Sequence, residues 1–217
     1  MLASSNPDLK KIRIKICGLT RVEDAVAAVN AGADAIGLVF YAKSPRAISI
    51  EIARQIALVA GPFVTVTGLF VGADPKEVTD VLKQVPLHLL QFHGDESPAY
   101  CESFQRSYLK AIRMKPDVNL DDAIAEYASA SGILLDAYRP GVPGGTGETF
   151  DWGRVPRQST TPIVLAGGLT PENVIQAIES TRIYGVDVSG GVESAPGLKD
   201  PNKIRDFISN AQLARQH

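Results

Sequence analysis

The chain has 217 residues, of which 45% are hydrophobic and 21% are charged, and its formal net charge is -2 at neutral pH. This is the composition of an ordinary globular protein, and a chain of this length buries a sizeable core without disulfides or metal ions. The absence of a basic tract argues against nucleic acid as a partner, so any anion-binding site must be local.

The beginning of the chain is short and polar, with no apolar core of a secretion signal. We expect residues 1–10 to form a flexible N-terminal lead and residues 11–217 to form one catalytic domain. No apolar run approaches the roughly 20 residues needed to cross a bilayer, so no membrane association is expected. Two cysteines far apart in an ordinary chain predict reduced thiols and a cytoplasmic location.

Short apolar runs rich in β-branched residues alternate with amphipathic stretches along the whole chain. The runs predict strands at residues 12–16, 35–40, 64–71, 87–92, 108–112, 132–136, 162–166 and 185–188. Each run is continuously apolar rather than alternating, which is typical of parallel strands buried on both faces.

The stretches between these runs predict helices at residues 22–30, 51–60, 75–85, 99–106, 119–129, 173–180 and 202–213. Four of the helices are expected to start at a capping residue followed by proline, at Asp74-Pro75, Ser97-Pro98, Thr170-Pro171 and Asp200-Pro201. The sixth connection is different. Residues 137–149 are rich in glycine and proline, and only a short helix fits before the seventh strand.

Strand–helix units of about 20 to 30 residues predict an α/β fold, a single-domain (βα)8 barrel of the TIM type. The alternative is an open doubly wound sheet, which is disfavoured because the chain has no early G-x-G-x-x-G segment. In a barrel the chemistry is located at the carboxyl ends of the strands. The topology therefore indicates where functional side chains should be sought.

Two adjacent strand ends, after the seventh and eighth strands, are rich in glycine. Glycine lets backbone N–H groups converge on an anion, and this pair of loops is a frequent phosphate site of the fold. The alternative is that these glycines only make tight turns. We expect a phosphate group to be bound by Gly145, Gly167, Gly168, Ser189 and Gly190.

Cys17 and Asp136 stand at the ends of the first and sixth strands. A cysteine is most often a small buried hydrophobe, and a carboxylate at a strand end can simply cap a loop. At this end of a barrel, a thiol acts as a base or nucleophile once its pKa falls toward neutral. Desolvation raises the pKa of a carboxylate and lets it serve as an acid. We expect Cys17 and Asp136 to be the catalytic pair, on opposite sides of a phosphorylated sugar.

Three further side chains are candidates for substrate contacts. Arg46 follows Ser44-Pro45 in a loop, where its guanidinium either holds a substrate carboxylate through a bidentate fork or is a solvated charge. His93 follows the fourth strand, where a structural role is equally expected. Asp187 lies in the eighth strand and either binds a substrate amine or hydroxyl or orders the loop that follows. No cluster of His, Cys, Asp and Glu has the spacing of a metal site.

Read in order, the strand ends resemble the phosphoribosylanthranilate isomerases of tryptophan biosynthesis. The motifs cover nearly the whole chain after the first ten residues, and their order and spacing make the resemblance specific. They are KICGLT from residue 15, GLVF from 37, SPR from 44, GLFV from 68, LQFHGDE from 90, LD from 135, GGTG from 144, FDW from 150, LAGGL from 165 and DVS from 187.

The resemblance implies an Amadori rearrangement of N-(5-phosphoribosyl)anthranilate to 1-(2-carboxyphenylamino)-1-deoxyribulose 5-phosphate, without a cofactor. It implies that Asp136 protonates the ring oxygen and opens the sugar, and that Cys17 then removes the proton at carbon 2. Arg46 would contact the anthranilate carboxylate. A monomer or homodimer is expected. Two positions depart from the family pattern, since Gly190 stands where a second serine is frequent and Phe92 where leucine is frequent.

Three alternatives are weighed against this interpretation. The isomerase of the histidine pathway catalyses the same type of rearrangement, but similarity to it implies a carboxylate where this chain has Cys17. A metal-dependent sugar-phosphate epimerase needs a cluster of His and Asp ligands, and the chain has only three histidines. A non-catalytic phosphate-binding protein is disfavoured because the chain carries both Cys17 and Asp136.

Overall fold

A computed structural model describes residues 11–137 and 149–214, in which eight parallel strands close into a barrel. The strands are β1 (Arg13–Cys17), β2 (Ala35–Phe40), β3 (Thr65–Phe70), β4 (Leu89–Phe92), β5 (Tyr108–Arg113), β6 (Gly132–Asp136), β7 (Ile163–Leu165) and β8 (Gly185–Val188). They pair in the order of the sequence, and β8 pairs with β1 to close the sheet. The predicted (βα)8 barrel is confirmed, and the predicted lead lies outside the described residues.

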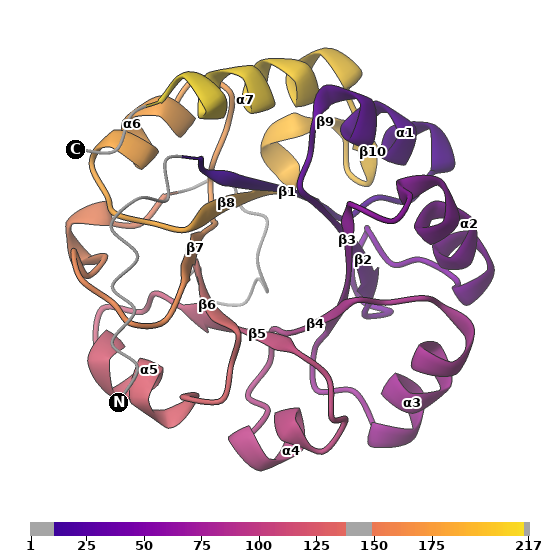
Figure 1. Ribbon diagram of the computed structural model, residues 1–217, viewed down its shortest axis with the longest axis horizontal. Coiled ribbons are helices and arrows are strands. Elements are labelled where there is room, and N and C mark those ends of the chain that lie inside the picture. The colour runs from indigo at the N-terminus through magenta and orange to yellow at the C-terminus, as the bar shows by residue number, and fades with distance from the viewer. Residues whose placement is uncertain (1–10, 138–148, 215–217) are drawn as a thin grey trace.

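Helices surround the barrel as an outer ring when it is viewed along its axis (Figure 1). They are α1 (Val22–Ala31), α2 (Ile50–Ala60), α3 (Pro75–Gln84), α4 (Pro98–Glu102), α5 (Leu120–Glu126), α6 (Val174–Glu179) and α7 (Pro201–Leu213). Short elements complete the described chain: the 3-10 helices η1 (Trp152–Arg154) and η2 (Gly190–Val192), and an antiparallel pair of strands, β9 (Glu193–Ala195) and β10 (Leu198–Lys199). No helix in the described part of the chain is both long and apolar enough to span a membrane.

Three of the four predicted cap-proline starts are confirmed, at Asp74, Ser97 and Asp200. Asp74 accepts a hydrogen bond from the backbone of Lys76 at the start of α3, and Asp200 caps α7 in the same way. The helix predicted over residues 173–180 after Thr170-Pro171 is observed as α6, which begins at Val174. The Thr170 hydroxyl accepts from the Glu172 backbone N–H, and the Asn173 side chain accepts from the Thr170 N–H, as in a capping box.

The fourth helix is shorter than predicted. It ends at Glu102 rather than continuing to residue 106, and the chain then passes through Gln105, whose φ of +51° is left-handed. A left-handed residue cannot continue a right-handed helix. The sixth connection contains only η1 among its described residues, in agreement with the short helix that the sequence predicts.

The apolar core has two parts, because successive side chains of a strand point to opposite sides of the sheet. The larger part lies between the barrel and its helices and includes Ile14 and Ile16 of β1. Smaller apolar groups are formed by alternate strand residues inside the barrel, one of them around Cys17. Lys15 stands two residues before Cys17 and therefore shares the inner side of β1.

Candidate active site

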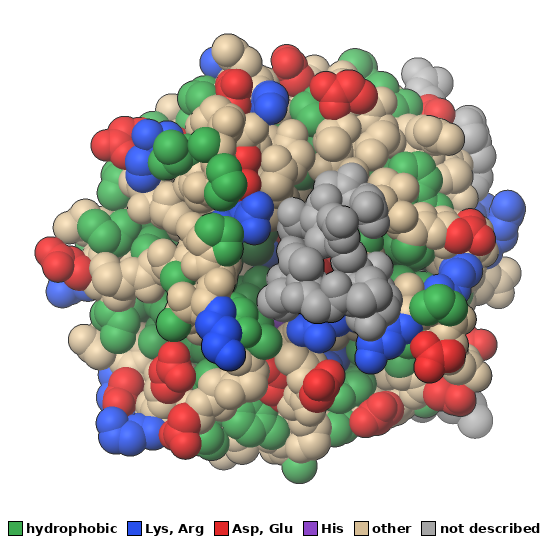
Figure 2. Space-filling view, turned by 180° about the vertical axis from the view of Figure 1, so that it is seen from behind, with side chains coloured by type: hydrophobic (Ala, Val, Ile, Leu, Met, Phe, Trp, Pro, Cys, Tyr) green, Lys and Arg blue, Asp and Glu red, His purple; other side chains and the backbone are tan. Residues whose placement is uncertain are grey.

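The carboxyl ends of the strands gather the predicted catalytic pair at one end of the barrel. Cys17 ends β1 and Asp136 ends β6, and each has only 5% of its surface exposed. The two strands are not adjacent, since β7 and β8 lie between them in the sheet. Figure 2 shows the face on which the strands end, and Lys and Arg side chains lie around its middle. A chain with a net charge of -2 thus presents local positive charge where an anion is expected.

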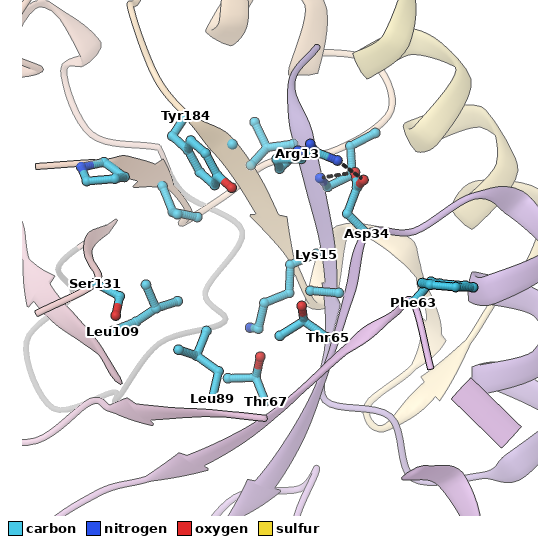
Figure 3. A pocket seen from close by; sticks show the side chains of 16 residues that line it. Arg13, Lys15, Asp34, Phe63, Thr65, Thr67, Leu89, Leu109, Ser131 and Tyr184 are labelled. Carbon is cyan, nitrogen blue, oxygen red and sulfur yellow. Dashed lines mark hydrogen bonds and ion pairs between the residues drawn. The ribbon is translucent and has the colours of Figure 1, made fainter. Parts of the chain in front are cut away.

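Cys17 lies beside a buried ion pair inside the barrel. The Nζ atom of Lys15 donates to Oδ1 of Asp187 over 2.9 Å, and these side chains are only 6% and 8% exposed. The Lys15 ammonium also interacts electrostatically with the Cys17 thiol, and Nζ and Sγ both lie beside Gly37. Figure 3 shows Lys15 extending from β1 into the barrel interior. We call Lys15, Cys17 and Asp187 the thiol cluster.

Burial raises the pKa of the Cys17 thiol, and the negative charge of Asp187 acts in the same direction. Lys15 is the strongest influence that lowers this pKa, and Lys199 lowers it less. The net result is a raised pKa, which differs from the fall toward neutral that a base at this position requires. The surrounding cations therefore decide how much thiolate is available.

Asp136 is held by a chain of neutral hydrogen-bonding groups. Its Oδ2 lies 3.0 Å from Nε2 of His93, and Nδ1 of His93 lies 3.3 Å from Nε2 of Gln91. Because the Gln91 amide N–H can only donate, Nδ1 accepts, and the imidazole proton sits on Nε2 and is donated to the carboxylate. We call Gln91, His93 and Asp136 the carboxylate cluster. It gives His93 an orienting role in addition to the substrate contact predicted for it.

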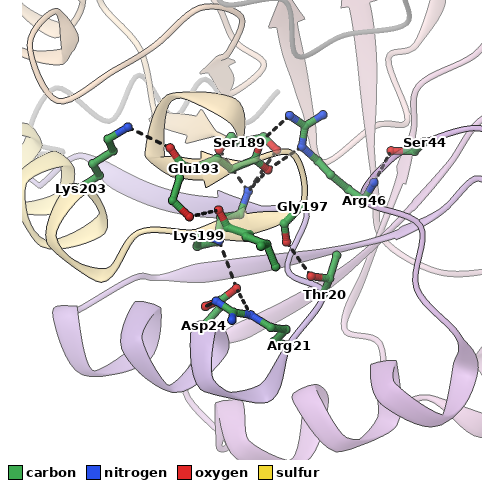
Figure 4. Close-up of polar contacts among 12 residues, drawn as sticks. Thr20, Arg21, Asp24, Ser44, Arg46, Ser189, Glu193, Gly197, Lys199 and Lys203 are labelled. Carbon is green, nitrogen blue, oxygen red and sulfur yellow. Dashed lines mark hydrogen bonds and ion pairs between the residues drawn. The ribbon is translucent and has the colours of Figure 1, made fainter.

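Arg46 is not a solvated loop charge, because it forms a two-pronged ion pair with Glu193 (Figure 4). Its Nε and Nη2 atoms donate to the two carboxylate oxygens over 2.7 and 2.8 Å. Glu193 also accepts from Nζ of Lys199 over 2.9 Å, and Lys199 reaches the backbone oxygen of Ser189 over 3.1 Å. Burial opposes the ionisation of Glu193, but Arg46 and Lys199 outweigh it and lower the pKa of this carboxyl group.

Two glycines allow the strand-end loops to approach one another closely. Gly18 has a φ of +72°, and a Cβ atom there would lie 2.5 Å from Cδ of Arg46 and 3.0 Å from Oγ of Ser189. Gly167 has a φ of +78°, and a Cβ atom there would lie 2.8 Å from Oδ1 of Asp136. The loops after β1, β2 and β8 therefore meet around Gly18, and the loop after β7 meets the end of β6.

The predicted phosphate-binding residues that the structure describes lie in the neighbouring loops after β7 and β8, since these two strands pair in the sheet. Gly168 is also left-handed, with a φ of +68°, and its carbonyl accepts from the side chain of Asn173. Ser189 accepts from Lys199, and Gly190 opens η2. Gly145, which the sequence predicts to close over the phosphate, lies outside the described residues. Phosphate binding by these loops stays a prediction.

Sequence reasoning missed three ionisable residues of the site, Lys15, Glu193 and Lys199. Lys15 had a usable signal, because a lysine two positions before Cys17 in an apolar strand must share its side of the sheet. Glu193 and Lys199 had no such signal, because pairing of β9 with β10 brings them together. Asp24 of α1 also holds Lys199, by accepting from its backbone N–H over 3.2 Å. Asp187 was predicted either to bind a substrate amine or hydroxyl or to order the loop after the eighth strand, and the structure pairs it with Lys15.

A closed barrel with ionisable side chains gathered at the carboxyl ends of its strands is the architecture of a TIM-barrel enzyme. Comparison with known proteins narrows this class. The model of the N-(5'-phosphoribosyl)anthranilate (PRA) isomerase family matches residues 14–210, and the chain belongs to that family.

Relatives agree with this assignment over nearly their whole length. The chain is 70% identical to an N-(5'-phosphoribosyl)anthranilate isomerase of Cellvibrio japonicus, covering 95% of this chain and 96% of the relative. It is 58% identical to one from Pseudomonas fluorescens strain Pf0-1, covering 93% and 98%.

Solved structures show the same similarity. The phosphoribosyl anthranilate isomerase of Thermotoga maritima superposes with a TM-score of 0.85 at 43% identity, covering 92% of this chain and 98% of that one. A second isomerase structure, in complex with reduced 1-(o-carboxyphenylamino)-1-deoxyribulose 5-phosphate, gives a TM-score of 0.78 at 40% identity, with the same coverage. A third, from Thermotoga maritima, is described as a monomer generated from a dimeric isomerase, with a TM-score of 0.77 at 39% identity, again covering 92% and 98%.

Proposed function

We propose that the chain converts N-(5'-phosphoribosyl)anthranilate to 1-(2-carboxyphenylamino)-1-deoxyribulose 5-phosphate in tryptophan biosynthesis. The observation that carries this conclusion is membership of the isomerase family over residues 14–210, together with a thiol and a carboxyl group at two separate strand ends of one barrel. The reaction is an internal oxidation and reduction between two carbons of the sugar, and one acid with one base is sufficient for it.

The proposed first step is opening of the ribose ring by Asp136. Its carboxyl group gives a proton to the ring oxygen, the bond from that oxygen to carbon 1 breaks, and carbon 1 and the anthranilate nitrogen become a protonated Schiff base. Nε2 of His93 lies 3.0 Å from Oδ2 of Asp136, and this hydrogen bond holds the carboxyl group in position. Because residue 167 is a glycine, the loop after β7 can pack closely against the same carboxyl group.

The proposed second step is removal of the carbon 2 proton by the Cys17 thiolate. The electron pair of the broken C–H bond moves to form the carbon–carbon double bond of an enolamine, which neutralises the Schiff base nitrogen. Tautomerisation to the ketone then returns a proton to carbon 1. Carbon 2 is oxidised and carbon 1 is reduced, so that no external oxidant or reductant is needed.

The remaining predicted contacts hold the two anionic ends of the substrate. Arg46 contacts the anthranilate carboxylate with the part of its guanidinium that is not engaged by Glu193. The loops after β7 and β8 bind the phosphate through backbone N–H groups. A substrate contact by Asp187 is compatible with its pairing to Lys15 through Oδ1 alone.

We propose a cytoplasmic monomer or homodimer as the working form. The dimeric relative from Thermotoga maritima supports considering a dimer. Sedimentation of the purified protein over a range of concentrations distinguishes the two states.

The assay that tests the function is conversion of freshly prepared N-(5'-phosphoribosyl)anthranilate, followed through the loss of its fluorescence. We expect the purified protein to turn over this substrate and its gene to restore growth of a tryptophan auxotroph that lacks this isomerase. Absence of turnover by the pure, folded protein would contradict the proposal and favour a binding protein.

A further inference from the structure

Lys15 is a buried charged residue to which the proposed reaction assigns no task. Its side chain is 6% exposed and lies inside the barrel, where other strands contribute apolar residues such as Val39 and Leu134. It also lines a cavity of about 380 Å³ together with Arg13 and Tyr184 (Figure 3). Arg13 is the first residue of β1 and Tyr184 directly precedes β8, so the cavity lies at the amino-terminal end of the barrel and Lys15 extends from there toward the thiol.

Stability alone is a weak explanation for this lysine. An ammonium and a carboxylate must both lose their hydration to enter a barrel interior, and a buried ion pair is often replaced by apolar side chains without loss of stability. The Lys15–Asp187 pair therefore calls for a reason in the chemistry of its surroundings. Among the described residues, the proposed reacting group with which Lys15 interacts electrostatically is the Cys17 thiol, whose sulfur lies beside Gly37 as Nζ of Lys15 does.

We propose that Lys15 is a positioning residue of the isomerisation, whose ammonium favours ionisation of the Cys17 thiol against burial and orients its sulfur to receive the carbon 2 proton. This inference rests on the proposed function. In the step itself the proton passes from carbon 2 to the Cys17 sulfur, while Lys15 keeps its protons and its bond to Asp187.

The charges that face Cys17 come from several elements. On its own strand stands Lys15, and β8 contributes Asp187, which favours the thiol form. The β10 strand contributes Lys199 and the loop after β2 contributes Arg46, both of which are coupled to the thiol electrostatically. Of these cations, Lys15 has the largest effect on the pKa of Cys17.

Asp187 keeps Lys15 charged in this setting. Burial by itself lowers the pKa of the Lys15 ammonium, but the charges of Asp187 and Cys17 outweigh burial and raise it. Lys15 thus stays an ammonium at the pH at which the thiol must ionise. One carboxylate stabilises the cation, and the cation stabilises the thiolate.

Gly37 on β2 provides the space for this contact. A Cβ atom there would lie 2.6 Å from Sγ of Cys17 and 3.1 Å from Nζ of Lys15. A methyl group in this position would force the two atoms away from their present places. Glycine at this position therefore belongs to the same arrangement.

The principal test is Lys15→Met, which keeps the length of the side chain and removes its charge. We expect kcat at neutral pH to fall about 10- to 100-fold, because each unit of increase in the pKa of Cys17 reduces the thiolate about tenfold. We expect KM to change much less, and kcat to recover as the pH is raised. Titration of the thiolate by its ultraviolet absorbance, with Cys17→Ser as the blank, should show the same upward shift.

Lys110→Met is the matched control, because this chain contains a second ion pair buried to a similar degree. Lys110 and Glu96 are 2.9 Å apart and each is 3% exposed, on the outer side of the barrel beside Tyr127. Its loss should lower stability without moving the titration of Cys17. Gly37→Ala is the second variant, in case Lys15→Met does not fold, and it should shift the Cys17 titration in the same direction without removing a charge.

Each outcome decides the proposal. An unmoved Cys17 titration in the folded Lys15→Met variant, or in Gly37→Ala where only that variant folds, overturns it. A loss of kcat that is equal at every pH, and equal in Lys110→Met, overturns it as well. The thiolate titration does not depend on turnover. If Cys17→Ser proves fully active, the base role in the proposed function fails, while the titration still reports whether Lys15 controls the thiol.

Discussion

The thiol cluster and the carboxylate cluster of the candidate site surround their central groups with different kinds of neighbours. The thiol cluster places a full ion pair, Lys15 with Asp187, against Cys17. The carboxylate cluster places only a neutral imidazole and an amide behind Asp136. Cys17 and Asp136, the proposed catalytic groups, are each 5% exposed, so the degree of burial does not distinguish them.

This difference in neighbours fits the proposed roles of Cys17 as a base and Asp136 as an acid. A buried thiol resists losing its proton, and only a neighbouring positive charge offsets the desolvation of the thiolate. A carboxyl group that serves as an acid must not be stabilised too strongly as an anion, and a neutral N–H donor stabilises an anion less than a cation does. The pKa values of the proposed acid and the proposed base are thus set apart by the charges of their neighbours rather than by different degrees of burial.

The largest expected effect comes from removing either catalytic group. Cys17→Ser and Asp136→Asn should each lower kcat by about 10² to 10⁴, the range typical of general acid–base catalysis. Binding of a reduced product analogue should survive in both, since neither change removes an anion-binding group. Steady-state kinetics and calorimetric titration measure the two quantities. Full activity of either variant removes that residue from the mechanism.

Asp187→Asn should have the next largest effect, this time on stability. It leaves the Lys15 ammonium buried without its carboxylate, and loss of one partner of a buried pair costs about 3 to 5 kcal/mol in free energy of unfolding. Urea denaturation followed by circular dichroism measures the change. The expected loss is larger than for an exposed pair such as Lys76 with Asp80, for which Asp80→Asn is the control.

Replacing both Lys15 and Asp187 sharpens this test, because it separates the effect of the ion pair on the free energy of unfolding from its effect on kcat. The double variant Lys15→Met with Asp187→Leu should recover most of the stability lost in Asp187→Asn, since apolar side chains fit an apolar barrel interior. Its kcat should stay low. Recovery of both stability and kcat would show that the ion pair serves the fold alone.

The sequence was sufficient for the barrel and for the strand-end positions of the two proposed catalytic groups. Continuous apolar runs define parallel strands, and a strand end is fixed once its strand is known, so that Cys17 and Asp136 follow from periodicity and topology. Helix ends were less certain. The fourth helix was predicted to continue to residue 106, yet it ends at Glu102, and the left-handed conformation of Gln105 beyond it has no clear signal in the sequence.

The ion-pair partners of the site residues could not be predicted from the sequence pattern. The partnership of Lys15 with Asp187 joins residues 172 positions apart, and that of Arg46 with Glu193 joins residues 147 positions apart. Such contacts depend on which strand ends and loops meet after the barrel closes. No local spacing encodes them, and for this reason Arg46 had the alternative of a solvated charge until the structure excluded it.

Arg46→Lys tests the anion-binding side of the site and should have a moderate effect. Lysine keeps the positive charge but has no planar fork, so it cannot hold Glu193 and a substrate carboxylate in the present geometry. We expect KM to rise about tenfold, which corresponds to about 1.4 kcal/mol of binding free energy, while kcat changes less. A fall in kcat with unchanged KM would instead place Arg46 in the chemical step.

The smallest expected effect concerns His93 and distinguishes orientation from proton transfer in the carboxylate cluster. His93→Ala removes the N–H that reaches Asp136, and loss of one neutral hydrogen bond, about 1 kcal/mol, corresponds to roughly a fivefold lower kcat. His93→Gln keeps an N–H donor near that position and should retain more of the activity. If His93 carried the proton itself, both variants would lose kcat by orders of magnitude, as Asp136→Asn does. A graded loss, with Gln above Ala and both far above Asp136→Asn, establishes that the imidazole orients the acid and leaves proton transfer to the carboxyl group.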